Sequence, residues 1–426
     1  MKLKKYKFGE LIDVTRGASL SGEFYATEGE YVRLTCGNFD YRNNCFKENK
    51  SKDNIYYTGS FREEFLMEEG DIITPLTEQA IGLLGSTAFI PEGGKYIQSQ
   101  DVAKIICNEE LLDKKFAFYL ISSSLVKQQL SAAAQQTKIR HTSPDKIKDC
   151  IVWIPELAEQ KRIGQLLFSL DQKIALNRAI NDNLEAMAKQ LYDYWFVQFD
   201  FPNEEGKPYK SSGGKMVWND KLKREIPEGW YADNICRIAD ILSGGTPSKQ
   251  IDSYWQNGNI PFFGPTDYAG AIFQLNTAEH ITSDGLKHCA SSLFEEGVVI
   301  ITARGSIGKL VIIGTPMAMN QSCYAFRSRN NEFEYLYFLT AQLIEHLKAK
   351  GSGSVFKSII TTDIENSILS IADETTITLF TSTIRPLMNA IKENTKQIEV
   401  LTKQRDELLP LLMNGQVSVN YHLAHD

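Results

Sequence analysis

The 426-residue sequence lacks the long apolar segments that mark membrane and secreted proteins. It contains no apolar run of about 18 residues, the length that a membrane-spanning helix needs. The basic N-terminus is followed by mixed polar and aromatic residues instead of the apolar core of a signal peptide. We therefore expect a cytoplasmic protein that does not enter a membrane.

Cysteine and histidine patterns that bind metal ions are also missing. The seven cysteines are scattered, no two have Cys-x-x-Cys spacing, and the six histidines form no pair at ligand spacing. We expect reduced thiols and no metal site.

Catalytic motifs are absent as well. The sequence has no GxSxG elbow, no HExxH helix, no glycine-rich dinucleotide fingerprint and no Asn-Pro-Pro-Tyr-like motif of amino-methyltransferases. The string GSIGK (305–309) is similar to part of a phosphate-binding loop, but its spacing is too short and Leu310 replaces the required Ser or Thr. We expect no catalytic residues and no cofactor bound by this chain.

Composition indicates a globular protein of two or three domains. Hydrophobic residues make up 42% and charged residues 23%, and 426 residues exceed one ordinary core. The net charge of −7 argues mildly against nucleic acid, but phosphate binding needs local Lys and Arg and does not need a basic total.

The chain contains an internal repeat with a period of about half its length. The string LIDVTRGAS (11–19) matches IADILSGGT 227 positions later, and the same offset relates EGDIIT (69–74) to EGVVII. Each copy precedes a long stretch of helical character, so the order is domain, helix, domain, helix. The residues between these repeated strings differ between the two copies, as expected for two binding modules with different targets. A duplication without two functional sites is the alternative.

Two long stretches show apolar residues at alternating steps of three and four, which is typical of coiled coils. One runs from residue 157 to about 196 and the other from 377 to 412, each about 40 residues and roughly 60 Å as a helix. We expect Pro386 to kink the second helix or to mark its start, and Pro410 and Gly415 to end it.

Each helix is the obvious partner for the apolar positions of the other. We therefore expect an antiparallel coiled coil that relates the two domains by a pseudo-two-fold axis, with asparagines that fix its register. Two helices that pack only on their own domains are the alternative. The predicted coiled-coil and partner-docking residues are Ile163, Leu170, Ile174, Asn177, Leu184, Leu191, Ile391, Asn394, Ile398, Leu401 and Leu408.

Short β-rich runs between turn residues and short helices predict an α+β fold for both domains. Their loops place Gly beside Arg, Lys, Ser and Thr, side chains that contact phosphates, while Arg, Asn and Gln can read base edges. For any single loop, an ordinary turn with solvated charges is the alternative. The predicted DNA-contacting residues are Arg16, Ser19, Lys138, Arg140, Thr246, Ser248, Lys249, Arg304, Ser306, Lys309, Asn320, Gln321 and Lys357.

Several strings resemble those of Type I restriction-modification specificity subunits. WFVQFDFP (195–202), GKPYKSSGG (206–214) and IPEGW (226–230) are similar to the junction after the central helix of that family. The strings that resemble its recognition domains and its helix ends are SGGTPS (243–248), ARGSIG (303–308), PELAEQKRI (155–163) and RDELLPLLMNG (405–415). The resemblance spans nearly the whole chain, although the first domain has RGAS (16–19) where the second has GGTP.

The resemblance implies a protein that reads DNA and catalyses nothing itself. Each target recognition domain would read one half of a split double-stranded DNA sequence, and the coiled coil would set the gap. Two modification subunits would bind along the helices and methylate adenine, and restriction subunits would cleave unmodified DNA. S-adenosylmethionine, ATP and Mg are expected on those partner subunits.

The resulting domain prediction follows the repeat. It consists of a recognition domain (1–155), a central helix (156–200), a second recognition domain (201–372), a distal helix (373–415) and a tail (416–426). The first alternative function is a bipartite scaffold that binds protein without DNA specificity. A second alternative, an intrinsic methyltransferase, needs a cofactor-binding fold that the sequence does not show.

Overall fold

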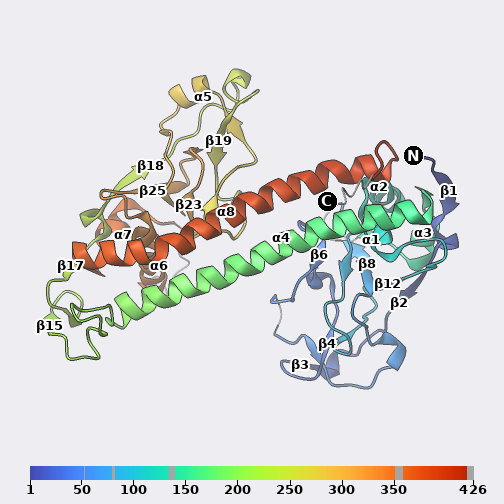
Figure 1. Cartoon of the computed structure of the whole chain (residues 1–426), viewed down its shortest axis with the longest axis horizontal. Helices are drawn as coiled ribbons and strands as arrows, with labels where there is room; N and C mark the ends of the chain where they lie inside the picture. Colours follow the sequence, from blue (N-terminus) through green and yellow to red (C-terminus); the bar gives the residue numbers. More distant parts are fainter. Residues whose placement is uncertain (52, 79–81, 134–139, 351–357, 420–426) are drawn as a thin grey trace, which may run out of the picture. The chain divides into compact units, whose positions relative to one another are not determined.

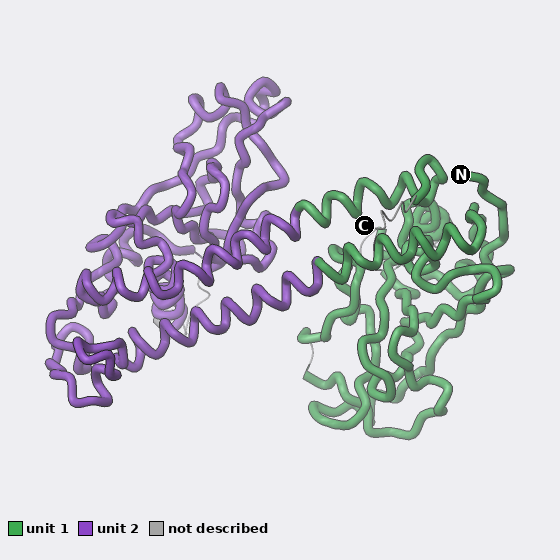
Figure 2. Tube along the Cα trace, in the orientation of Figure 1, with its two compact units in different colours: residues 1–173, 400–426 green, residues 174–399 purple. Residues whose placement is uncertain are grey.

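The computed structural model describes residues 1–51, 53–78, 82–133, 140–350 and 358–419. The chain divides into two compact units, residues 1–173 with 400–426 and residues 174–399, which we call unit 1 and unit 2 (Figure 2). Two long helices, α4 (Leu157–Tyr192) and α8 (Glu374–Met413), contribute residues to both units. Within the described ranges, no helix is both long and apolar enough to cross a membrane.

Unit 1 has a mixed α+β fold around a four-stranded antiparallel sheet ordered β10-β8-β12-β2 (Figure 1). Its strands are β1 (Lys4–Lys7), β2 (Ile12–Arg16), β3 (Tyr25–Ala26), β4 (Tyr31–Arg33), β5 (Phe39–Asp40), β6 (Cys45–Phe46), β7 (Tyr56–Tyr57), β8 (Ile72–Pro75), β9 (Thr77–Glu78), β10 (Ala88–Phe89), β11 (Tyr96–Ile97), β12 (Val102–Cys107), β13 (Arg140–His141) and β14 (Ile151–Ile154). Its short helices are α1 (Lys114–Ser122), α2 (Ser124–Ala133) and α3 (Pro144–Lys148). The sheet packs against α1 and the start of α4 in one hydrophobic core.

Unit 2 has a similar fold around a five-stranded sheet ordered β18-β25-β22-β23-β20. Its strands are β15 (Met216–Asn219), β16 (Arg224–Pro227), β17 (Tyr231–Asp233), β18 (Ala239–Ser243), β19 (Ile260–Phe263), β20 (Phe273–Gln274), β21 (His280–Ile281), β22 (Val299–Thr302), β23 (Leu310–Ile313), β24 (Ala318–Met319), β25 (Cys323–Ser328) and β26 (Leu369–Ile371). Its helices are α5 (Ser283–Lys287), α6 (Phe333–Lys350) and α7 (Thr361–Glu365). Side chains of α6, α8 and the end of α4 share its core.

The predicted repeat is visible in the strand pairing. The order β2-β12-β8-β10 in unit 1 corresponds to β18-β25-β22-β23 in unit 2. The first strand of each copy pairs with the last, since β1 pairs with β14 and β17 with β26, both antiparallel. Each copy also contains a parallel pair, β4 with β11 and β19 with β24. The two sequence copies therefore have the same architecture.

One glycine position shows why the repeat keeps its landmarks. A Cβ atom on Gly17 would lie 2.1 Å from the carbonyl oxygen of Gln98, and one on Gly244 would lie 2.2 Å from that of Asn320. These distances are too short for any side chain, so both copies need glycine where the first sheet strand crosses this loop.

The two long helices run antiparallel, as predicted. In unit 1, Asp171 of α4 contacts Arg405 of α8, and in unit 2, Asn181 contacts Asn394. As the residue number rises along α4 it falls along α8. The alternative in which each helix packs only on its own domain is wrong.

The ends of α8 differ in part from the prediction. The helix begins at Glu374, where Asp373 caps it by accepting a hydrogen bond from the backbone N–H of Thr376. Pro386 therefore lies inside the helix and does not mark its start. Buried neighbours such as Phe380 and Ile384 hold this segment on the core of unit 2, and that packing offsets the helix cost of proline, about 3 kcal/mol.

Gly415 ends α8 as predicted, whereas Pro410 lies within the helix. Gly415 has a φ of +70°, its N–H donates to the carbonyl of Leu412, and the N–H of Gln416 donates to that of Leu411. This is the Schellman arrangement, in which glycine adopts the left-handed conformation that other residues avoid.

Candidate nucleic-acid interface and docking helices

Three of the predicted loops of the second domain meet at the ends of its main sheet. The N–H of Gly245 donates to the carbonyl of Met319 at 3.1 Å, and the N–H of Arg304 donates to that of Ser322 at 3.2 Å. The hydroxyl of Thr246 donates to the side-chain oxygen of Gln321. The loop after β18, the loop after β22 and residues 320–322 thus form one surface, which we call the loop cluster.

The predicted contact residues of this cluster are available to a ligand. All but one are exposed, and Asn320 is half-buried; the exposed residues are Thr246, Ser248, Lys249, Arg304, Ser306, Lys309 and Gln321. Among the residues that the structure describes, the guanidinium of Arg304 has no hydrogen-bond or ion-pair partner. It is therefore the cation of the cluster best placed to bind an outside anion or base edge.

The turn that carries Arg304 is held by local contacts. The hydroxyl of Thr302 accepts a hydrogen bond from the N–H of Lys309 at 3.0 Å and donates to the carbonyl of Ser306. Gly305 and Gly308 have φ values of +76° and +78°, a conformation that favours glycine. The arginine thus projects from a preorganised turn.

The two lysines of the cluster are less free than Arg304. Lys249 forms an ion pair with Glu279, and its Nζ lies 3.6 Å from the ring centroid of Trp255. Lys309 Nζ lies 5.1 Å from the ring centroid of Tyr268. Tyr268 is not among the site residues predicted from the sequence, because its nearness to Lys309 depends on the parallel pairing of β20 with β23.

The predicted residues of the first domain have mixed surroundings. Arg16 and Ser19 are exposed, and Arg16 Nε donates to the carbonyl of Gln100 at 2.8 Å. Arg140 forms an ion pair with the buried carboxylate of Glu78 and also donates to the carbonyl of Ser131. A buried carboxylate needs such a compensating charge, so Arg140 serves the fold directly.

Two predicted contact residues, Lys138 and Lys357, lie outside the described residues. For the remaining ones, contact with DNA stays a prediction. Across the described ranges, no three His, Cys, Asp or Glu side chains are grouped so that they could hold a metal ion.

The predicted coiled-coil residues do not form one uniform seam. Ile163 packs in the core of unit 1, whereas Ile174 and Ile391 are buried farther along the helix pair. The half-buried members are Leu170, Asn177, Leu184, Leu191, Asn394, Ile398, Leu401 and Leu408.

Asparagines form a polar contact inside the unit 2 part of the helix pair. Asn181 is 7% exposed, and its amide donates to the carbonyl of Ile391 and to the hydroxyl of Thr395, each at 3.3 Å. Asn394 donates to the side-chain oxygen of Asn181 at 3.0 Å. Asn177 and Gln397 make a second, exposed contact of 3.1 Å. The contact between Asn181 and Asn394 specifies which turns of α4 and α8 lie together.

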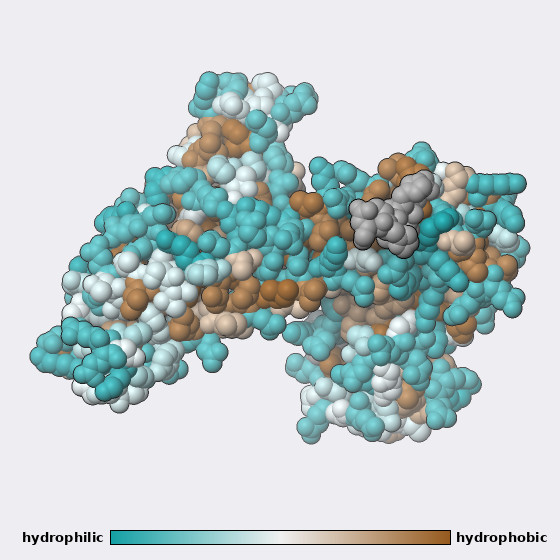
Figure 3. All heavy atoms as spheres, viewed as in Figure 1, coloured by the Kyte–Doolittle hydropathy of each residue, from teal (hydrophilic) through white to brown (hydrophobic). Residues whose placement is uncertain are grey.

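A second apolar face of α4 was missed by the sequence analysis. Leu176, Ile180 and Met187 are 61%, 38% and 56% exposed, and their spacing places them on one side of the helix. Figure 3 shows hydrophobic residues gathered in a band along α4. We call these three residues the outer face of α4, because Asn181 contacts α8 from a different side.

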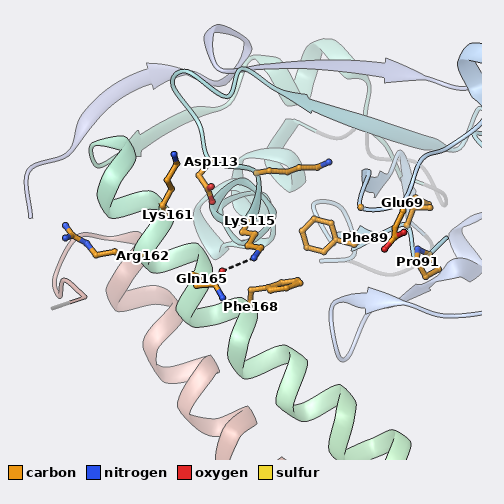
Figure 4. Close-up of a pocket in the computed structure, with 12 residues that line it drawn as sticks. Glu69, Phe89, Pro91, Asp113, Lys115, Lys161, Arg162, Gln165 and Phe168 are labelled. Atoms are coloured by element: carbon orange, nitrogen blue, oxygen red, sulfur yellow. Dashed lines mark hydrogen bonds between the residues drawn. The ribbon is translucent and has the colours of Figure 1, made fainter. Parts of the chain in front are cut away.

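Unit 1 has a hollow of about 820 Å³ where α1, the start of α4 and the strand β10 meet (Figure 4). Phe89 and Phe168 form an aromatic floor, with ring centroids 5.8 Å apart. The Nζ atom of Lys115 lies 4.4 Å from the ring centroid of Phe168 and donates a hydrogen bond of 2.8 Å to the side-chain oxygen of Gln165. None of the predicted DNA-contacting residues that the structure describes lines this hollow.

Gly164 explains how α1 approaches α4 so closely in this region. A Cβ atom at position 164 would lie 2.7 Å from the backbone nitrogen of Phe116. The glycine, which looks like a weak point in the helix sequence, is required by this crossing.

The family model "Type I restriction modification DNA specificity domain" matches residues 2–186 and 227–400. The chain belongs to this family. Its fold is α+β with two related recognition domains, and its role in restriction-modification is DNA recognition without catalysis.

Individual relatives agree with this assignment. The MjaIX specificity subunit of Methanocaldococcus jannaschii is 28% identical over 313 residues, which are 72% of this chain and 69% of the relative. The HindI specificity subunit of Haemophilus influenzae is 23% identical over 76% of this chain and 81% of its own. The crystal structure of the S subunit from M. genitalium has the same fold, with a TM-score of 0.61 at 16% identity over 97% of this chain and 96% of that one.

Proposed function

We propose that this chain is the subunit of a Type I restriction-modification complex that selects the DNA site. Each domain reads one half of a bipartite double-stranded sequence. The observation that carries the proposal is the double match to a DNA specificity family, one match per copy. The repeated sheets support it, since two similar frames can present different loops.

In the second domain, the loop cluster is the proposed reading surface. Arg304 and Gln321 are side chains that pair with base edges, whereas Thr246 and Ser306 offer hydroxyls to phosphate oxygens. The negative total charge of the chain is compatible with this role, because phosphate contacts depend on the local cations.

The helices α4 and α8 are the proposed spacer that sets the gap between the half-sites. The hydrogen bond between Asn181 and Asn394 supports this role, because a spacer needs one register.

We further propose that two modification subunits dock along the helices. The outer face of α4 supports this, because exposed Leu and Met in a row on one helix side are typical of protein contacts. S-adenosylmethionine, ATP and Mg would bind to the modification and restriction subunits. We place the whole complex in the cytoplasm, with the DNA that it would read.

Selection from a random pool of double-stranded DNA tests the proposal. The full chain, assembled with its modification subunit, is expected to enrich two short sequences at a fixed separation. The modification subunit alone is the control and should enrich no such pair. Assembly without any enriched sequence would favour the protein-binding scaffold.

A further inference from the structure

A hairpin in unit 2 exposes apolar side chains that the reading of DNA does not explain. It consists of β15 and β16, which pair so that Trp218 lies opposite Glu225. Val217 is 44% exposed and Trp218 is 58% exposed. Neighbouring residues of a strand point to opposite faces, so both faces of this ribbon present an apolar group to solvent.

The indole of Trp218 is held in this exposed position. Its Nε1 donates to a carboxylate oxygen of Asp220 at 3.1 Å, within the turn of the hairpin. The turn itself is fixed by the side-chain oxygen of Asn219, which accepts hydrogen bonds from the N–H groups of Lys221 and Leu222 at 3.0 and 3.2 Å. A preorganised, exposed tryptophan loses little conformational freedom when it binds a partner.

The base of the hairpin is packed firmly on the rest of unit 2. Ile226 is buried, and Trp230, just after the hairpin, stacks on Phe201 with 5.2 Å between ring centroids. Phe201 in turn stacks on Tyr209 at 4.6 Å. The hairpin is therefore a rigid projection anchored in an aromatic cluster.

The charge of the turn indicates what kind of surface it fits. Lys221, Lys223 and Arg224 are all exposed, and Asp220 is the one carboxylate between Asn219 and Arg224. Lys223 Nζ lies 3.8 Å from Asp220 Oδ1. Because three cations stand against this one carboxylate, the tip has a net positive charge. A partner surface with carboxylates around an apolar pocket would complement this tip.

The hairpin is continuous with the outer face of α4. Directly after α4, in the π-helical turn Asp193–Val197, Tyr194 is 37% exposed and Val197 is 44% exposed. Arg224 of the hairpin donates to the carbonyl of Val197 at 3.4 Å. A subunit that covers the outer face of α4 would therefore reach the hairpin.

We propose that the β15–β16 hairpin is a docking arm for the modification subunit bound along α4 in unit 2, and that Trp218 enters an acidic-rimmed apolar pocket of that subunit. This inference rests on the proposed function. A protein partner is favoured over DNA because Trp and Arg dominate protein interface energies, and because the duplex exterior offers no apolar pocket for Val217.

The position of the hairpin has a consequence for the two modification subunits. Both strands lie between the two matches of the family model, apart from Pro227, where the second match begins. The repeated surfaces do not include the arm. One modification subunit thus gains a contact that the other lacks, and the two binding sites differ in affinity.

Native mass spectrometry of the full chain titrated with its modification subunit tests this inference. For the wild type we expect two subunits to bind. For Trp218→Ala we expect one of the two to dissociate at least about tenfold more readily, so that complexes with a single modification subunit accumulate. The charge variant Lys221→Glu/Lys223→Glu should act in the same direction, and its side chains are exposed, so the fold is preserved.

Trp153→Ala is the matched control, because Trp153 is also exposed, at 39%, but lies on β14 of unit 1. It should leave both sites unchanged. Equal binding of two modification subunits by Trp218→Ala and the wild type would overturn the docking arm and leave the proposed function intact. Weaker DNA binding with unchanged assembly would overturn it in favour of a nucleic-acid contact. A wild-type chain that binds no modification subunit would contradict the proposed function itself.

Discussion

Replacing either buried Asn181 or half-buried Asn394 in the helix pair should destabilise unit 2, and replacing both should not. Asn181 makes three hydrogen bonds, to Ile391, Thr395 and Asn394. Asn181→Leu removes them and leaves the amide of Asn394 facing an apolar group. An unsatisfied buried polar group costs about 1–3 kcal/mol, so each single leucine variant should lose roughly this amount of unfolding free energy.

The double variant Asn181→Leu/Asn394→Leu should recover most of the loss, because no polar group remains unpaired and two leucines fit a coiled-coil seam. Urea denaturation of the wild type, both single variants and the double variant gives the coupling energy, which we expect to be about 1–2 kcal/mol. Asn177→Leu is the control, since its contact with Gln397 is exposed and its loss should cost well under 1 kcal/mol.

Additive effects of the two leucines would refute the reasoning, because they would mean that the asparagines do not depend on each other. The same variants address function. If the asparagine pair fixes the register, the double variant should keep its stability, but the modification subunits assembled on it should methylate DNA sites with a less well defined gap.

Three further predictions concern other parts of the chain. Arg304→Ala should weaken DNA binding about 5- to 100-fold and leave assembly intact, measured by fluorescence anisotropy and size-exclusion chromatography; lost assembly with intact folding would contradict the proposed contact. Asn in place of Leu401 or Leu408 should lower the melting temperature or prevent subunit docking. Unchanged assembly and DNA recognition would contradict a role of these leucines in the helix pair or in docking. Burial and the neighbouring Asp182 raise the pKa of Glu185 to about 7, which disfavours its charged form in the folded state, so stability should fall as the pH rises from about 4.5 to 7. Glu185→Gln should therefore stabilise the protein by about 1–2 kcal/mol at pH 8 and by little at pH 4, and an equal gain at both pH values would contradict this cause.

The features that the sequence predicted best are those that repeat or are periodic. The repeated strings at an offset of 227 positions were enough to predict two domains of one architecture. Positions in these strings tolerate few residue types, as Gly17 and Gly244 show, because a Cβ atom there would collide with the backbone. The alternating spacing predicted both long helices, because such spacing places apolar groups on one helix side. The antiparallel arrangement followed from the order of domains and helices along the chain.

The features that the sequence did not predict depend on contacts between distant segments. The basic stretch around Arg140 predicted a DNA contact, which stays a prediction, but it did not predict the ion pair with Glu78. Glu78 lies 62 positions earlier and is brought to Arg140 by the pairing of β13 with β9. Pro386 signals a helix start locally, yet packing against the core of unit 2 extends the helix beyond it. The outer face of α4 was not predicted, because the heptad pattern describes one apolar side of a helix. This helix has a second apolar side.

The central claim is that this chain selects a bipartite DNA site, and the adenine methylome tests it most directly. A methylation-free host would express the chain together with its neighbouring modification subunit, and long-read sequencing would locate methylated adenines. The account predicts a split motif with a fixed gap that disappears when this chain is omitted. A complex that assembles and folds but produces no methylation, or methylation that persists without this chain, would contradict it.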